Sequence, residues 1–384
     1  MATASNGTRA EAAYQVKVDL RDPVEATATP SAAVPPTGGW YRSPVEVALT
    51  GADAPGGSGM AAIEYQLNGG PVQSVAHGSS VRLEADGELT LTFRPVDRAG
   101  RRGPVQAPLA VRIDQTPPEV ACGAADGQWH GADVSVGCTA GDGGSGLALP
   151  GDASFTLATA VPAGSETASA ATESRQVCDV AGNCTAAGPV GGHRVDRKGP
   201  EVRISSPAAA RYLVNEPVSA AYECSDGGSG VASCTGPVAT GAAVDTGSAG
   251  ARQFSVEAAD GVGNRSQATV SYSVGYRACL RYDPDRPRNA GSTVPVEVQV
   301  CDAAGANLSS ADLVVTAVGV VHAATGAAVP LQSPGRSQPG DHFTFGGGSY
   351  TFNVGTSGYG PGRYELRFTV AGDPAVHAAP FTIR

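Results

Sequence analysis

Three consecutive segments of this chain carry the same series of markers in the same order. Each opens with a D-x-x-x-P element, at Asp19–Pro23, Asp114–Pro118 and Asp196–Pro200, so the period is about 80 to 95 residues. An Asp/Gly/Ser loop follows, preceded in the first two segments by a tryptophan, and a second acidic turn closes each segment. A repeat of this length is one small domain used several times. The chain is therefore expected to fold as a series of similar units and not around one large core.

Apolar and polar residues alternate between these markers. Val45, Val47 and Leu49 are separated by Glu46 and Ala48, and the stretch from Leu89 to Phe93 has the same pattern. A period of two is typical of strands with one buried and one exposed face in antiparallel sheets. The 52 glycines and 28 prolines disfavour long helices, while 41% hydrophobic residues suffice for folded domains. We predict an all-β fold, an elongated tandem array of immunoglobulin-like β-sandwiches.

The markers also carry a family resemblance. Residues 20–276 resemble the bacterial immunoglobulin-like repeats of secreted and surface proteins, especially those of actinobacteria, through the D-x-x-x-P element, Trp40 and Trp129, the D-x-x-S-G loop and the D-x-x-G-N turn. The first segment departs from this pattern because its turn, Asp97–Arg101, ends in Gly-Arg. The chain also lacks the strand C tryptophan and the cysteine pair between strands B and F of antibody domains. The resemblance implies a structural or adhesive role with no common activity.

Residues 277–384 break the repeat. They resemble the PxKF-type β-sandwich that often closes such secreted proteins, although the naming motif reads Pro295-Val-Glu297-Val298 here. We therefore predict five parts: a stray strand or the tail of a preceding repeat at 1–19, Ig-like repeats at 20–114, 115–196 and 197–276, and the PxKF-type sandwich at 277–384.

The first part has three interpretations. Residues 13–19 read like the last strand of a repeat whose other strands are missing. They are either the remainder of a longer array, a strand donated to a neighbouring subunit, or a strand that folds back on its own chain.

The eight cysteines divide evenly among the predicted domains, as zero, four, two and two. Even counts favour pairing within each domain, and short loops closed in this way stabilise a small sandwich by about 3 kcal/mol each. Free thiols and zinc are the alternatives, but no C-x2-C pair occurs. Disulfides indicate an oxidising location, extracellular or at the cell surface. The predicted pairs are Cys122 with Cys138, Cys178 with Cys184, Cys224 with Cys234, and Cys279 with Cys301.

Acidic residues are expected to converge at one end of each sandwich. In this topology the B–C and F–G loops emerge at the same pole, where the incoming linker also arrives. Several carboxylates with loop carbonyls suit Ca²⁺, which takes six to eight oxygen ligands. The alternative is that each aspartate caps its own turn and needs no ion. The three sets are Asp19, Asp53 and Asp97; Asp114, Asp142 and Asp179; and Asp196, Asp226 and Asp260.

Nothing in the sequence points to catalysis. There is no G-x-S-x-G, H-E-x-x-H or phosphate-loop motif, and the six histidines are scattered. A net charge of −10 disfavours nucleic acid as a partner, and no apolar run is long enough to cross a bilayer. We expect no enzyme.

Three functional hypotheses remain. The first is a stalk, spacer or adhesive module whose partners are other domains of a longer chain or a surface glycan or protein. The second is a subunit of a phage tail, injection particle or surface filament that self-associates through the N-terminal strand. The third is a carbohydrate-binding surface protein in which Trp40 and Trp129 stack on sugars, although their shared position before a strand favours packing.

Overall fold

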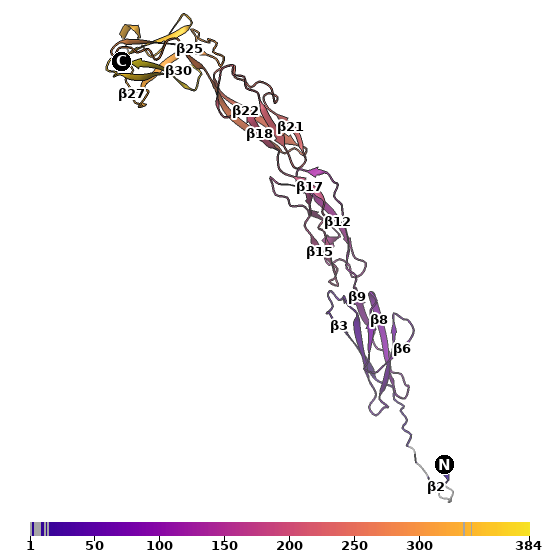
Figure 1. The fold of residues 1–384 in the computed structure, drawn as a ribbon. Coiled ribbons are helices and arrows are strands. Elements are labelled where there is room, and N and C mark those ends of the chain that lie inside the picture. Colours follow the sequence, from indigo (N-terminus) through magenta and orange to yellow (C-terminus); the bar gives the residue numbers. More distant parts are fainter. Residues whose placement is uncertain (1, 4–8, 11–12, 14, 333–334, 339) are drawn as a thin grey trace. The chain divides into compact units, whose positions relative to one another are not determined.

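The computed structural model describes residues 2–3, 9–10, 13, 15–332, 335–338 and 340–384 (Figure 1). Within these ranges the regular structure is β-strand, with two short 3-10 helices, η1 (Pro150–Ala153) and η2 (Gly335–Ser337). The fold is all-β, a tandem array of β-sandwiches, as predicted. Among the described residues no helix has the length and apolar character needed to span a membrane.

Contacts divide the chain into two compact units. One comprises the described residues up to 128 together with 133–160 and 168–194, and the other comprises 129–132, 161–167 and 195–384. Four clusters of buried residues lie within these units, one inside each of the four predicted domain ranges. The exact domain boundaries stay a prediction.

The first sandwich places two antiparallel sheets around one core. Val45, Val47, Leu49 and Leu91 are fully buried, so the alternation predicted from the sequence sets which face of each strand is inside. One sheet has the order β3 (Glu25–Ala32), β4 (Val45–Ala52), β7 (Ser80–Leu83). The other has the order β6 (Gln73–Ala76), β5 (Met60–Leu67), β8 (Gly87–Asp97), β9 (Leu109–Ile113).

The second sandwich has a small core of Cys138, Leu157, Val177 and Ala187. One sheet has the order β10 (Glu119–Cys122), β12 (Ser135–Gly141), β13 (Ser154–Ala158), and β15 (Arg175–Cys178) pairs with β16 (Cys184–Ala187). The chain passes from one unit to the other at the start of β11 (Trp129–His130) and within β14 (Glu166–Ala170) and β17 (His193–Asp196).

The third sandwich is built around Phe254, Val256, Tyr272 and Val274. It pairs β18 (Glu201–Ser206) with β20 (Ala221–Ser225). Its second sheet has the order β19 (Arg211–Leu213), β23 (Arg265–Gly275), β22 (Gly250–Asp260), β21 (Val231–Thr235), in which β19 and β23 are parallel.

The fourth sandwich has the most aromatic core, with Tyr350, Phe352, Phe368 and Phe381 almost completely buried. One sheet has the order β24 (Arg277–Leu280), β25 (Thr293–Cys301), β29 (Ser349–Gly355), β28 (Thr344–Gly346). The other has the order β27 (Ala328–Val329), β26 (Val315–His322), β30 (Gly362–Val370), β31 (Val376–Ile383).

The strand predicted at residues 13–19 does not form. Tyr14 lies outside the described residues, and the described residues of this segment have no strand partner, with Val16 81% exposed and Val18 71% exposed. The fold-back interpretation is therefore wrong for these residues. The alternation of apolar side chains is present, but a strand also needs a neighbouring backbone with which to share hydrogen bonds. Upstream, β1 (Ala2–Thr3) pairs with β2 (Arg9–Ala10).

The cysteines form four disulfides in the predicted pairs. Cys122 and Cys138 are directly opposite in β10 and β12, and Cys178 and Cys184 are opposite in β15 and β16. The sandwich with the smallest core thus contains two of the four cross-links.

Candidate functional site: acidic clusters at the strand ends

Strand ends bring the predicted carboxylates together. Asp53 follows β4 and Asp97 is the last residue of β8, while Asp19 lies in the segment that enters the first sandwich. One carboxylate oxygen from each of these three lies within 4.8 Å of the others, and the same is true of Asp114, Asp142 and Asp179. The sequence thus predicted the members of two clusters.

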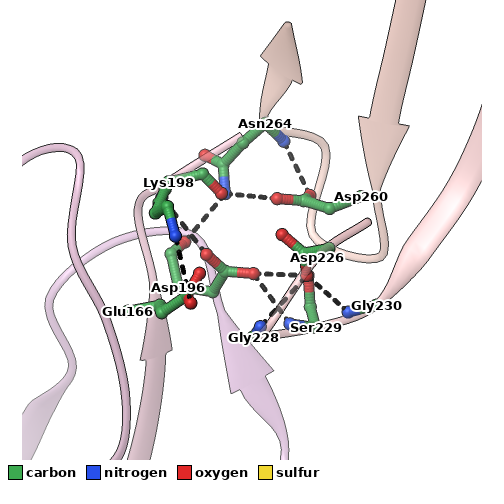
Figure 2. Close-up of polar contacts among 9 residues, drawn as sticks. All are labelled: Glu166, Asp196, Lys198, Asp226, Gly228, Ser229, Gly230, Asp260 and Asn264. Atoms are coloured by element: carbon green, nitrogen blue, oxygen red, sulfur yellow. Dashed lines mark hydrogen bonds and ion pairs between the residues drawn. The ribbon is translucent and has the colours of Figure 1, made fainter. Parts of the chain in front are cut away.

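The third cluster differs from the prediction. It contains Glu166, Asp196 and Asp226, so Glu166 of β14 takes the place expected for Asp260. Both carboxylate oxygens of Asp260 accept hydrogen bonds within its own turn, from the Val262, Gly263 and Asn264 backbone and from the Asn264 side chain (Figure 2). No repeat marker distinguishes Glu166, because only the tertiary structure brings β14 next to this loop.

One aspartate of each cluster caps the glycine-rich loop. Oδ2 of Asp142 accepts hydrogen bonds from the Gly144 and Gly146 amides at 3.1 and 2.7 Å. Asp226 accepts from Gly228 and Gly230 at the same distances, as Figure 2 shows. These bonds satisfy amides that a tight loop would otherwise leave unpaired. This is the turn-capping role that the sequence analysis gave as the alternative to calcium binding.

The linker aspartate fastens the entering chain to the same loop. Asp19, Asp114 and Asp196 each accept a hydrogen bond from the amide of the loop serine, at 2.5, 2.6 and 2.8 Å. The carboxylate packs so closely that a Cβ on Gly144 would lie 2.5 Å from Cγ of Asp114. The close approach of the linker carboxylate thus explains the glycine that precedes the loop serine, and the serine amide donates the hydrogen bond to that carboxylate.

These hydrogen bonds favour the charged form of the linker aspartates. The amides of Arg21 and Ser58 hold the pKa of Asp19 below its ordinary value. Burial alone would raise the pKa of Asp196, but hydrogen bonds from Ser229 and Lys198 outweigh it and lower the pKa. Both residues are therefore carboxylates at neutral pH.

An asparagine amide completes two of the closing turns. Oδ1 of Asp179 accepts from the Gly182 and Asn183 amides, and Oδ2 accepts from Nδ2 of Asn183 at 2.7 Å. The same Nδ2 donates to the Asp114 carbonyl at 2.9 Å. Asn264 repeats both contacts with Asp260 and the Asp196 carbonyl, at 2.7 and 3.0 Å.

A fourth turn of this form was missed in the sequence. Oδ1 of Asp302 accepts from the Ala306 amide at 2.9 Å, and Oδ2 accepts from Nδ2 of Asn215 at 3.1 Å. Its local signal is the sequence Asp-Ala-Ala-Gly after β25. The donor comes from a distant part of the chain and could not be found by spacing.

The turn of the first sandwich has no such donor. The Arg101 amide donates to Oδ1 of Asp97 at 2.8 Å, but Oδ2 is buried without a hydrogen-bond partner, and Asp97 as a whole is 1% exposed. The third cluster also has buried oxygens without a hydrogen bond, Oδ1 of Asp226 and Oε2 of Glu166. There, however, Nζ of Lys198 lies 3.3 Å from Oε1 of Glu166 and supplies a positive charge (Figure 2).

The tryptophans lie near the start of their sandwiches and are half-buried. The Arg112 guanidinium lies over the ring of Trp40, 5.9 Å from its centroid, and Trp129 begins β11. The carbohydrate-stacking interpretation of these rings stays a prediction.

A buried aspartate that the sequence analysis did not single out for a role lies in the last sandwich. Asp373 accepts hydrogen bonds from the Tyr276 amide at 2.7 Å and pairs with His377 Nε2 at 2.8 Å. It also forms an ion pair with Arg211 of β19 at 3.1 Å. These contacts tie the third sandwich to the fourth within one unit.

The comparisons with known proteins leave the family open. No family model and no curated protein matches the sequence. Among solved structures, the extracellular cadherin domains 3–6 of protocadherin gamma B2 match 91% of this chain and 94% of that chain, at 15% identity and a TM-score of 0.28. A tetra-tandem repeat from the extending region of a large adhesion protein matches 94% of this chain and 100% of that chain, at 15% identity and a TM-score of 0.25. Immunoglobulin domains 1–4 of Sidekick-1 match 93% of this chain and 99% of that chain, at 8% identity and a TM-score of 0.19. At these scores the likeness carries no argument about function.

Proposed function

We propose that this chain is a non-enzymatic structural or adhesive module, a rod-like stalk or spacer of immunoglobulin-like sandwiches outside the cell. The proposal rests on the hydrogen bonds that the acidic residues accept at the ends of the sandwiches. Each linker aspartate accepts a hydrogen bond from the loop serine of the sandwich that it enters, so the entering chain is fastened to that sandwich. Reinforced links are what a spacer needs, because a load on the chain acts on them first.

The disulfides support an extracellular or cell-surface location. All eight cysteines are paired, and such bonds persist in oxidising compartments. The resemblance to secreted actinobacterial repeats and to a PxKF-type closing sandwich is part of this proposal, and the attachment partner would be a surface protein or glycan, or further domains of the same polypeptide.

A subunit of a phage tail, injection particle or surface filament is a second candidate. It is favoured by one observation, the exposed Val16 and Val18 in a segment with the alternation of a strand and no partner strand. An added strand of this kind gives affinity through main-chain hydrogen bonds.

Light scattering coupled to size-exclusion chromatography distinguishes the stalk or spacer from the assembly subunit. A stalk or spacer is expected to elute as a monomer over the whole range of concentrations used. A concentration-dependent series of oligomers would contradict the stalk and favour the assembly subunit.

A further inference from the structure

The three acidic clusters are alike in sequence, but their carboxylates are not equally satisfied. In the described part of the chain, four turns begin with an aspartate whose Oδ1 accepts from the amide of the residue four positions on. In three of them an asparagine amide occupies Oδ2, from Asn183, Asn264 or Asn215. Among these four aspartates, only Asp97 has an Oδ2 that is buried without a partner.

A single substitution in the repeat accounts for the difference. The position of Asn183 and Asn264 is held by Arg101 in the first repeat. Its guanidinium turns away, and Nε donates to Oδ1 of Asp22 at 2.7 Å. The nearby Arg21 guanidinium donates to the Pro55 carbonyl. The two arginines donate backbone amides to Asp19 and Asp97, but their guanidinium groups are hydrogen-bonded to Pro55 and Asp22, outside the cluster.

A buried carboxylate oxygen without a partner is costly, and two further carboxylates nearby add repulsion. The oxygens of Asp19, Asp53 and Asp97 lie within 4.8 Å of one another. Two oxygens bound to one Ca²⁺ at its usual ligand distances are at most about 5 Å apart, so the spacing suits a shared ion. Three carboxylates form a donor set made only of hard oxygen ligands. Ca²⁺ binds ligands of this kind, whereas softer metals favour sulfur and nitrogen ligands.

We propose that Asp19, Asp53 and Asp97 bind one Ca²⁺ ion at the entrance of the first sandwich. In the second cluster the Asn183 amide donates to the Asp179 carboxylate, and in the third the Lys198 ammonium pairs with the Glu166 carboxylate. The repeats thus use different solutions to the same problem: an external cation in the first, an internal amide in the second and an internal ammonium in the third.

Isothermal titration calorimetry with CaCl₂ on the chelator-treated full chain tests the site. The unmodified protein is expected to bind one ion, and Arg101→Asn is expected to abolish binding, because the new amide takes the place of the ion at Oδ2 of Asp97. Arg101 is a surface residue, so this variant is expected to fold as the unmodified protein does.

A matched pair of variants locates the ion. Asp53→Asn and Asp142→Asn change the same loop position in the first and second sandwiches. The remaining oxygen can accept both loop hydrogen bonds at position 142 and one of the two at position 53. Calcium binding is expected to be lost in the first variant and unchanged in the second. Thermal unfolding in millimolar CaCl₂ and in EGTA should give a higher midpoint with calcium for the unmodified chain and equal midpoints for Arg101→Asn.

Two results would overturn the site. One is that the unmodified protein shows no heat of calcium binding and has the same thermal unfolding midpoint in CaCl₂ and in EGTA. The other is full binding by Arg101→Asn or by Asp53→Asn, which would place the ion elsewhere.

Discussion

Single aspartate and asparagine side chains hold the ends of these sandwiches by bonding both to the backbone and to each other. Asn183 is the clearest case, since one amide group donates both to the Asp179 carboxylate and to the Asp114 carbonyl. Each of these acceptors belongs to a residue that is almost completely buried. Removing the donor leaves both without a protein partner.

We therefore predict that Asn183→Ala lowers the free energy of unfolding by about 1–3 kcal/mol, the cost of leaving buried polar groups unpaired. Urea unfolding followed by circular dichroism measures the loss. Gln128→Ala, at an exposed position, is the control and should leave the midpoint unchanged. Equal midpoints for both variants would show that the amide contributes nothing.

Asp373 gives the protein an acid-sensitive contact. Burial would raise the pKa of Asp373, but hydrogen bonds from Ala375 and Tyr276 and the neighbouring His377 lower it below the ordinary value. A lowered pKa in the folded state means that the carboxylate stabilises the fold above its ordinary pKa of about 4. This stability is lost as the pH falls through the folded pKa.

The free energy of unfolding should therefore fall below about pH 4, and less steeply in Asp373→Asn than in the unmodified protein. Urea unfolding at a series of pH values provides the comparison. The same acid slope in both proteins would contradict the role assigned to Asp373.

At the scale of elements, the second sandwich depends on cross-links more than its neighbours do. Its four-residue core includes Cys138 itself, which is bonded to Cys122 of the neighbouring strand. Replacing both cysteines by alanine is expected to cost about 3 kcal/mol in the chain-entropy treatment of a loop of this size. Hydrogen exchange should show β10 and β12 losing protection first, while the strands of the aromatic fourth sandwich are unaffected. Unchanged exchange in β10 and β12 would contradict this account.

The N-terminal segment is the element without a partner. If Val16 and Val18 belong to a donated strand, removal of residues 1–18 should convert oligomers into monomers in size-exclusion chromatography. The stalk proposal predicts the same elution as a monomer with and without these residues. A shift to smaller size on truncation would favour the assembly subunit.

The sequence predicted local features well and non-local ones poorly. The alternation of Val45, Val47 and Leu49 identified a buried strand face because a strand's period is a property of its own residues. The same kind of alternation at Val16 and Val18 forms no strand within this chain, because pairing needs another segment. Repeat markers identified two acidic clusters completely, but Glu166 and the Asn215 amide enter their sites from distant parts of the chain. The missing asparagine at Arg101 was visible in the sequence, yet its meaning required knowledge of what Asn183 touches.

At the scale of the whole molecule, the proposed stalk is expected to be an extended series of sandwiches. Small-angle X-ray scattering on the monomer tests it most directly. Four sandwiches held end to end would span on the order of 150 Å and give a radius of gyration of roughly 40 Å. A compact chain of this length would have a radius of gyration of about 21 Å. We expect the larger value with a distance distribution that has a long tail, and a value near the compact one would contradict the stalk.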